Sequence, residues 1–264
     1  MPSDTLEPWR ADFYRETMKA LDEERIPFMV GGAYAFEQYT GIARDTCDFD
    51  IFVAREAVPE VFAAVESRGW RKELTFPHWL GKVYRDGAYV DVIFGAGNGV
   101  AMVDGEWRAH AERGRVLGRD ALLIPAEEMI WSKAFIMERE RFDGNDVMHV
   151  LRARGDRLDW DRLLRRFGRH WRVLFAHLVL FGFVYPAERG RIPARVLRAL
   201  AGRLAADEDG AEPGLCRGTL ISREQYLPDL RLWGYRDARL ELDVQMDEAD
   251  IARWTAAIDE AADG

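Results

Sequence analysis

The chain has little of what marks several classes of protein. Its 264 residues include only two cysteines, Cys47 and Cys216, and no Cys-x-x-Cys pair, which excludes a disulfide framework and a cysteine-based zinc or redox site. The longest apolar stretch, residues 171–185, contains Arg172 and His177 and is shorter than the roughly 20 residues that span a bilayer. The first residues lack the apolar core of a signal peptide. We therefore expect a soluble, cytoplasmic protein with no membrane partner.

Acidic residues outnumber basic ones, and lysine is rare. The chain has 37 Lys and Arg against 46 Asp and Glu, a net charge of −9, which argues against a protein that coats nucleic acid through bulk charge but leaves a local basic groove open. Only four of the basic residues are lysines, namely Lys19, Lys72, Lys82 and Lys133. Because lysine is rare in this chain, Lys133 is a candidate for contact with a triphosphate, which a compact point charge suits.

Hydrophobic patterning divides the chain in two. The first part alternates in type, with helices expected over 9–25, 33–39 and 59–68 and strands over 28–30, 48–53, 70–76, 82–85, 88–94 and 115–124. From Pro125 the pattern is helical, over 125–140, 146–154, 159–168, 170–184, 193–206, 222–233 and 247–262. These patterns predict an α+β fold, with an N-terminal mixed sheet flanked by helices (residues 1–120) and an α-helical C-terminal domain (residues 121–264).

Three of the acids on the predicted strands form a candidate site. Asp48 and Asp50 are two residues apart, so both carboxylates face one side of their strand while Phe49 and Ile51 face the other. Asp91 lies between apolar residues on the strand 88–94, which could be a neighbour. Oxygen clusters of this kind suit Mg²⁺, and three acids on adjacent strands can hold two ions for phosphoryl displacement.

Gly31 and Gly32 stand between a buried strand and a predicted helix. This arrangement allows backbone N–H groups to approach a polyphosphate closely, and the helix N-terminus favours negative charge. Together with the acids, it indicates chemistry on a nucleotide polyphosphate.

These motifs carry a resemblance to a known family. Val30-Gly31-Gly32, then Asp48-Phe49-Asp50, then Asp91 resembles the signature of the polymerase-β-like nucleotidyltransferase superfamily. The order Arg44-x-Thr46-x-Asp48-x-Asp50 is most similar to its abortive-infection toxin-like and antibiotic-modifying branches. The resemblance covers roughly residues 25–150. The chain departs from the pattern at Gly32, where many members have a serine, and in a slightly longer gap before Asp48.

The resemblance implies an enzyme that moves a nucleoside monophosphate from a nucleoside triphosphate such as ATP to an acceptor and releases pyrophosphate. By the same resemblance, residues 1–120 are the catalytic domain and residues 121–264 contribute to the cleft for nucleotide and acceptor. It implies that the acids are catalytic and bind Mg²⁺, with two ions expected. It also implies that a second set of residues binds the nucleotide. The acids are Asp48, Asp50 and Asp91, and the nucleotide-binding group is Gly31, Gly32, Arg44, Thr46 and Lys133.

Two classes of acceptor stay open. The acidic charge slightly favours a small molecule, whereas an RNA or protein acceptor, as in toxin-like relatives, is the rival. Eight arginines within residues 152–172 form either an electrostatic track for RNA or an ordinary helix face with ion pairs. A different class of function also stays open, a non-catalytic nucleotide-binding or interaction module on the same scaffold.

Individual side chains have structural alternatives as well. Arg44 contacts phosphate or acceptor, or forms a salt bridge with an acid such as Asp45. Thr46 binds nucleotide or orders its loop through a side-chain-to-backbone hydrogen bond. Asp143 and Asp146 cap the following helix or orient an active-site arginine.

Overall fold

The protein is represented by a computed structural model, which describes residues 6–44, 46–206, 212–241 and 244–262. Two compact units make up the chain, residues 1–125 and 126–264. The predicted boundary lies after residue 120. The structure divides the chain slightly later, because the last strand of the sheet, β7 (Arg119–Leu123), pairs with strands of the first unit.

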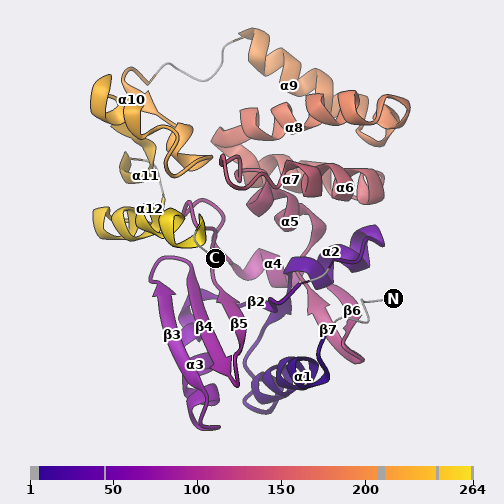
Figure 1. The fold of residues 1–264 in the computed structure, drawn as a ribbon. Helices are drawn as coiled ribbons and strands as arrows, with labels where there is room; N and C mark the ends of the chain where they lie inside the picture. Colours follow the sequence, from indigo (N-terminus) through magenta and orange to yellow (C-terminus); the bar gives the residue numbers. More distant parts are fainter. Residues whose placement is uncertain (1–5, 45, 207–211, 242–243, 263–264) are drawn as a thin grey trace. The chain divides into compact units, whose positions relative to one another are not determined.

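The first unit contains a seven-stranded sheet in the order β3-β4-β5-β2-β1-β7-β6 (Figure 1). The pairs β2·β5 and β1·β7 are parallel and the others are antiparallel, so the sheet is mixed, as predicted. Its other strands are β1 (Met29–Val30), β2 (Asp50–Phe52), β3 (Arg71–Phe76), β4 (Leu80–Arg85), β5 (Ala88–Ile93) and β6 (Glu112–Val116).

The predicted strand 115–124 is instead a hairpin of β6 and β7. Leu117 and Gly118 form its two-residue turn, with φ of 50° and 81°, and Val116 pairs with Arg119. A two-residue turn with both φ values positive matches the twist of antiparallel strands. The turn therefore folds the segment back on itself.

Four α-helices belong to the described part of the first unit. Proline stands in the first turn of both α1 and α3, where its missing N–H costs nothing. The short helix α4 was not expected from the patterning. Its N-cap is Asp104, whose carboxylate accepts the N–H groups of Glu106 and Trp107. The helices are α1 (Pro8–Glu23), α2 (Gly32–Thr40), α3 (Val58–Glu66) and α4 (Gly105–Ala109).

The two faces of the sheet differ in character. On the core face, Phe49, Ile51 and Val92 have no exposed surface, and Tyr14 of α1 stacks on Phe49 with ring centroids 4.8 Å apart. On the opposite side lie half-buried polar residues, which we name the acid face: Asp48, Asp50, Asp91, Lys82 and Tyr89. The strict alternation of side chains along a strand produces this separation.

The second unit is mainly helical, which confirms the predicted fold class. A two-stranded parallel sheet joins β8 (Leu215–Cys216) to β9 (Arg236–Asp237). The helices are α5 (Ala126–Lys133), α6 (Gly144–Arg154), α7 (Trp160–Phe167), α8 (Trp171–Val184), α9 (Ala194–Ala206), α10 (Leu227–Leu232), α11 (Ala238–Glu241) and α12 (Glu248–Ala262). Among the residues that the structure describes, no helix combines the length and apolar character needed to cross a membrane.

One predicted helix of this unit is shorter than expected. The pattern predicts a helix over residues 125–140, but α5 ends at Lys133. Beyond it, Met137 donates its N–H to the carbonyl of Ile221 at 3.0 Å and forms a bridge with Phe142. These backbone contacts, one of them with a residue far along the chain, replace the helical hydrogen bonds, so the helix stops.

Candidate active site

Cross-strand pairing brings two of the three predicted acids together. Asp50 of β2 lies directly opposite Asp91 of β5 in the parallel register, and Asp91 lies directly opposite Lys82 of β4 in the antiparallel register. Directly opposed side chains lie on the same face about 5 Å apart. The acid face therefore carries a row of carboxylate, carboxylate and ammonium across three adjacent strands.

Asp50 also lies against the glycine pair. The N–H of Gly31 donates to the backbone carbonyl of Asp50 at 3.0 Å. Gly32 has φ of +52°, and a Cβ atom built on it would stand 1.6 Å from Oδ2 of Asp50. Glycine at this position thus makes room for the Asp50 carboxylate at the first residue of α2, where the helix dipole favours negative charge.

The Asp48 carboxylate has a partner on the neighbouring strand. The hydroxyl of Tyr89 donates a hydrogen bond to Oδ1 of Asp48. Burial raises the pKa of Tyr89, and the bond to Asp48 raises it further, so the phenol remains protonated and donates. Asp48 precedes Asp50 by two residues and Tyr89 precedes Asp91 by two, which gives the acid face a second row.

Asp91 is paired with a lysine that the sequence reasoning missed. Lys82 Nζ lies 2.8 Å from Oδ1 of Asp91, and the two side chains are 20% and 15% exposed. The same ammonium lies 3.9 Å from the ring centroid of Tyr89. Burial raises the pKa of Asp91, while the charge of Lys82 and its hydrogen bond oppose that rise.

A turn signal in the sequence could have found this lysine. Asp86 and Gly87 separate the predicted strands 82–85 and 88–94, and Asp-Gly between alternating segments is a strong hairpin signal. A two-residue turn there pairs Arg85 with Ala88, as observed. Counting outward from that pair places Lys82 opposite Asp91.

The acid face suits a metal ion at the end that carries Asp48 and Asp50. In the described part of the chain, no three His, Cys, Asp or Glu side chains form a group that could hold a metal ion. Asp48 and Asp50 offer oxygen ligands, and Mg²⁺ commonly takes one or two carboxylates together with phosphate oxygens and water. Asp91 already faces the Lys82 ammonium. The residues therefore fit one ion at Asp48 and Asp50 better than two ions shared by all three acids.

Removing the lysine charge is expected to destabilise the first unit. In Lys82→Met the half-buried Asp91 carboxylate loses its cation and faces Asp50 directly, which is expected to cost about 3 kcal/mol of unfolding free energy. Mg²⁺ is expected to raise the melting temperature of this variant more than that of the wild type, because the opposed carboxylates attract a divalent cation. Denaturant unfolding and thermal melts with and without Mg²⁺ measure both effects.

Lys72→Met is the matched control. Lys72 on the neighbouring strand β3 pairs with Glu66 at 2.5 Å, but these side chains are 34% and 64% exposed. An exposed pair of this kind contributes less than about 1 kcal/mol. Equal loss of stability in the two variants would show that the Lys82–Asp91 pair is an ordinary surface contact.

The loop before β2 shows what Thr46 and Arg44 contact. The Thr46 hydroxyl accepts the N–H of Asp48 at 3.1 Å, so Thr46 orders the loop that carries Asp48. The Arg44 guanidinium lies 4.2 Å from the ring centroid of Phe36 in α2. Asp45, the suggested salt-bridge partner of Arg44, lies outside the described residues. Nucleotide contact by Arg44 and Thr46 stays a prediction.

Lys133 belongs to the second unit, where two carboxylates hold its ammonium. Nζ lies 2.7 Å from Asp143 Oδ2 and 2.8 Å from Asp146 Oδ2. Arg141 also bonds Asp143, at 2.8 Å. Although burial acts to raise the pKa of Asp143, the hydrogen bond from Arg141 and the charge of Lys133 lower it to about 2. Asp143 and Asp146 thus hold Lys133, and a phosphate contact by that lysine stays a prediction.

The arginine-rich segment 152–172 forms internal ion pairs. Arg162, only 3% exposed, bonds Glu127 and Glu128 of α5 at 2.5 Å each. Arg166 bonds Glu128 at 2.9 Å, and Arg152 bonds Glu188 at 3.0 Å. For these three arginines the alternative of a helix face with ion pairs is the one observed.

Comparison with known proteins finds matches among solved structures alone, and these are low in both sequence identity and TM-score. No protein-family model and no curated protein sequence matches the chain. The solution structure of the antibiotic-resistance factor ANT(2'')-Ia is 19% identical, with 77% of this chain and 97% of that chain covered and a TM-score of 0.41. The crystal structure of ANT(2'')-Ia with adenylyl-2''-tobramycin is 17% identical, covering 67% and 98%, with a TM-score of 0.42.

A third match is the lincomycin-bound lincosamide antibiotic adenylyltransferase LnuA, which is 14% identical, covers 53% of this chain and 94% of that chain, and has a TM-score of 0.38.

Proposed function

We propose that the chain is a Mg²⁺-dependent nucleotidyltransferase that moves a nucleoside monophosphate from a nucleoside triphosphate to an acceptor and releases pyrophosphate. The observation that carries the proposal is the placement of Asp50. Its carboxylate lies against Gly32 at the start of α2 and directly opposite Asp91. Acids and a helix N-terminus at one point are what a metal-bound triphosphate needs.

Each residue of the acid face has a role in this proposal. Asp48 and Asp50 hold Mg²⁺, which when bound supplies charge neutralisation on the triphosphate oxygens. Tyr89 orients the Asp48 carboxylate through its hydrogen bond. The first N–H groups of α2 bind phosphate oxygens. Asp91, kept in position by Lys82, accepts the proton of the acceptor hydroxyl or amine.

The acceptor in this proposal is a small molecule. The net charge of −9 disfavours long-range attraction of a polyanionic acceptor. Two of the arginines that could have supported an RNA track along α7, Arg162 and Arg166, are held in ion pairs by Glu127 and Glu128. An acceptor hydroxyl or amine near Asp91 is the chemistry that the acid face requires.

Transfer of label tests the proposal directly. Incubation with Mg²⁺ and α-³²P-ATP, or the other α-labelled triphosphates, across aminoglycoside-like, nucleoside and RNA acceptors is expected to give a labelled product. γ-³²P-ATP is expected to label only pyrophosphate. Chelation with EDTA and the change Asp48→Asn are each expected to reduce transfer at least about a thousandfold, equivalent to roughly 4 kcal/mol of barrier. Transfer that persists in EDTA and in the variant would contradict the mechanism.

A second candidate is a non-catalytic nucleotide-binding module. It is favoured by the partners that two of the acids already have, Tyr89 for Asp48 and Lys82 for Asp91. Under this candidate, Mg-ATP raises the melting temperature while no labelled product forms across the same acceptors. Turnover with any acceptor excludes it.

A further inference from the structure

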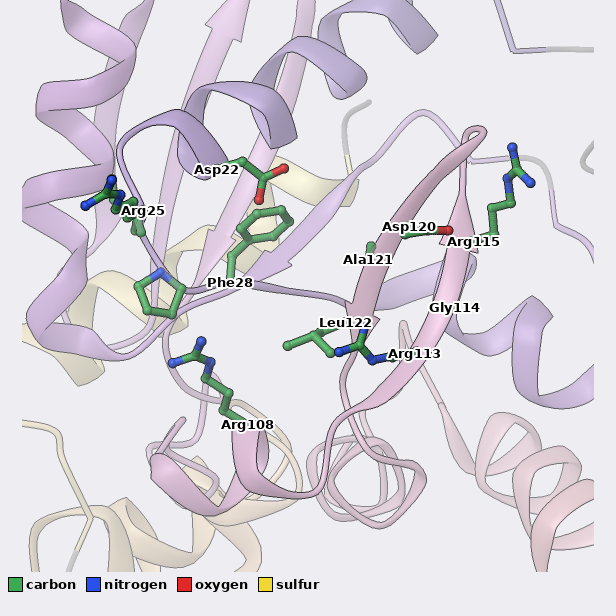
Figure 2. Close-up of a pocket in the computed structure, with 12 residues that line it drawn as sticks. Asp22, Arg25, Phe28, Arg108, Arg113, Gly114, Arg115, Asp120, Ala121 and Leu122 are labelled. Atoms are coloured by element: carbon green, nitrogen blue, oxygen red, sulfur yellow. The ribbon is translucent and has the colours of Figure 1, made fainter.

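The first unit contains a pocket that the proposed chemistry does not use. It has a volume of about 700 Å³ and lies between the segment from Asp22 to Phe28, helix α4 and the hairpin β6–β7 (Figure 2). Arginines dominate its charged lining, namely Arg25, Arg108, Arg113 and Arg115. In a chain with a net charge of −9, four arginines around one pocket are a local reversal of charge.

Three of these arginines are available to a ligand. Arg25, Arg108 and Arg113 are exposed, and their guanidinium groups make no ion pair or hydrogen bond within the described ranges of the chain. Arg115 differs, because it bonds the carbonyl of Gly118 at 3.3 Å and points away from the other side chains in Figure 2. Three guanidinium groups without protein partners favour an anionic ligand.

The acids of the pocket do not cancel this charge. Asp22 is neutralised by Arg119, whose Nη2 lies 2.9 Å from its Oδ2. Asp120 is therefore the acid left to oppose the three arginines among the residues that line the pocket. The pocket keeps a net positive charge.

An apolar surface lies between the arginines. Phe28 is half-buried, and Leu122 lies directly opposite Arg113 in the hairpin register. In Figure 2, Arg108 and Arg113 flank Leu122, and Phe28 lies across the pocket from them. Single-stranded nucleic acids combine the two features that match this surface, phosphates for arginine and flat bases that stack on aromatic side chains.

We propose that this pocket, which we name the arginine groove, binds a segment of single-stranded nucleic acid. Arg108 and Arg113 contact backbone phosphates, Arg25 binds a phosphate at the opposite rim, and a base packs on Phe28 and Leu122. An acidic peptide could pair with the same guanidinium groups, but its carboxylates leave the aromatic surface without a flat partner. The proposal concerns binding and does not depend on catalysis.

The register of the sheet gives the groove a relation to the acids. Val30 pairs with both Ile51 and Leu123, so their neighbours Asp50 and Leu122 lie on the same side of the sheet. Arg113 faces the same way as Leu122. Three strand spacings, roughly 15 Å, separate β2 from β6. The groove therefore lies apart from the acid face, and the binding proposed for it does not depend on the proposed transfer reaction.

Fluorescence anisotropy with a labelled ten-nucleotide oligo-U tests the groove. The double variant Arg108→Ala/Arg113→Ala is expected to bind about tenfold more weakly at low salt, and the slope of log K against log salt concentration is expected to fall by about 1.4 in magnitude. The control is Arg198→Ala/Arg231→Ala, which removes the same charge from exposed arginines of α9 and α10 and is expected to bind as the wild type does.

Three results would overturn the assignment. The first is unchanged binding in the groove variant, and the second is an equal loss in the control variant. The third is a polyglutamate peptide of the same length that binds as tightly as oligo-U and is lost in the same variant, because that identifies an acidic peptide. Measuring oligo-U binding by Asp50→Asn separates the two proposals. If this variant keeps oligo-U binding but lacks transfer, the groove is supported independently of the proposed activity.

Discussion

Replacing Asp50 with asparagine is expected to abolish nucleotidyl transfer while leaving the fold intact. The amide keeps the size of the side chain that lies against Gly32, but it removes the charge that would hold Mg²⁺ beside the α2 N-terminus. The loss is expected to be at least about a thousandfold in transfer rate, because neutralisation of triphosphate charge contributes several kcal/mol. Rates of α-³²P label transfer under saturating Mg²⁺ measure it.

Stability should hardly change in Asp50→Asn. The carboxylate gains about 0.3–1 kcal/mol from the helix dipole, but it also faces the Asp91 carboxylate, and these effects oppose each other. The control is Asp86→Asn, the same chemical change at an exposed turn residue between β4 and β5, which should leave transfer unaltered. Full transfer by Asp50→Asn, or a comparable loss in Asp86→Asn, would remove Asp50 from the mechanism.

Replacing Gly32 with alanine is expected to remove activity by a different route. The backbone at Gly32 has φ of +52°, and a Cβ would stand 1.6 Å from Oδ2 of Asp50. Either the Asp50 carboxylate or the start of α2 must move, and displacement of a catalytic group by about 1 Å can cost a hundredfold in rate. The strained backbone adds about 1–2 kcal/mol of destabilisation. Label transfer and denaturant unfolding measure the two effects separately.

Gly41→Ala separates backbone strain from the clash with Asp50. Gly41 ends the same helix with φ of +73°, and nothing lies within 4 Å of a Cβ built there. It should therefore lose about the same 1–2 kcal/mol and keep its transfer activity. If Gly41→Ala loses activity as severely as Gly32→Ala, the effect belongs to α2 as a whole and not to the Asp50 carboxylate.

Local sequence patterns predict much of the fold. The alternation in residues 48–53 predicts that Asp48 and Asp50 share a face opposite Phe49, and the structure has this arrangement. The end of α2 at Gly41 also follows from a local signal, glycine in a left-handed conformation. Such features depend on a few neighbouring residues, so they can be predicted without knowledge of the rest of the chain.

Local patterns failed where long-range contacts compete. The periodicity after Pro125 continues to residue 140, yet α5 stops at Lys133 because Met137 bonds Ile221 far along the chain. The scarcity of lysine drew attention to Lys133, whereas Lys82 is the lysine on the acid face. Residue type alone did not distinguish them, since the difference lies in which strand or helix each ammonium faces.

By itself, the sequence determined the strand–glycine–helix order, the shared face of Asp48 and Asp50, and the α+β class, because these follow from residue spacing and backbone preference. The tertiary structure alone decided three further points. It set the parallel register that opposes Asp50 to Asp91, the contact of Asp50 with Gly32, and the gathering of Arg108 and Arg113 in one groove. Each joins segments distant in the sequence, whose pairing is selected by burial of the whole sheet and not by any local signal.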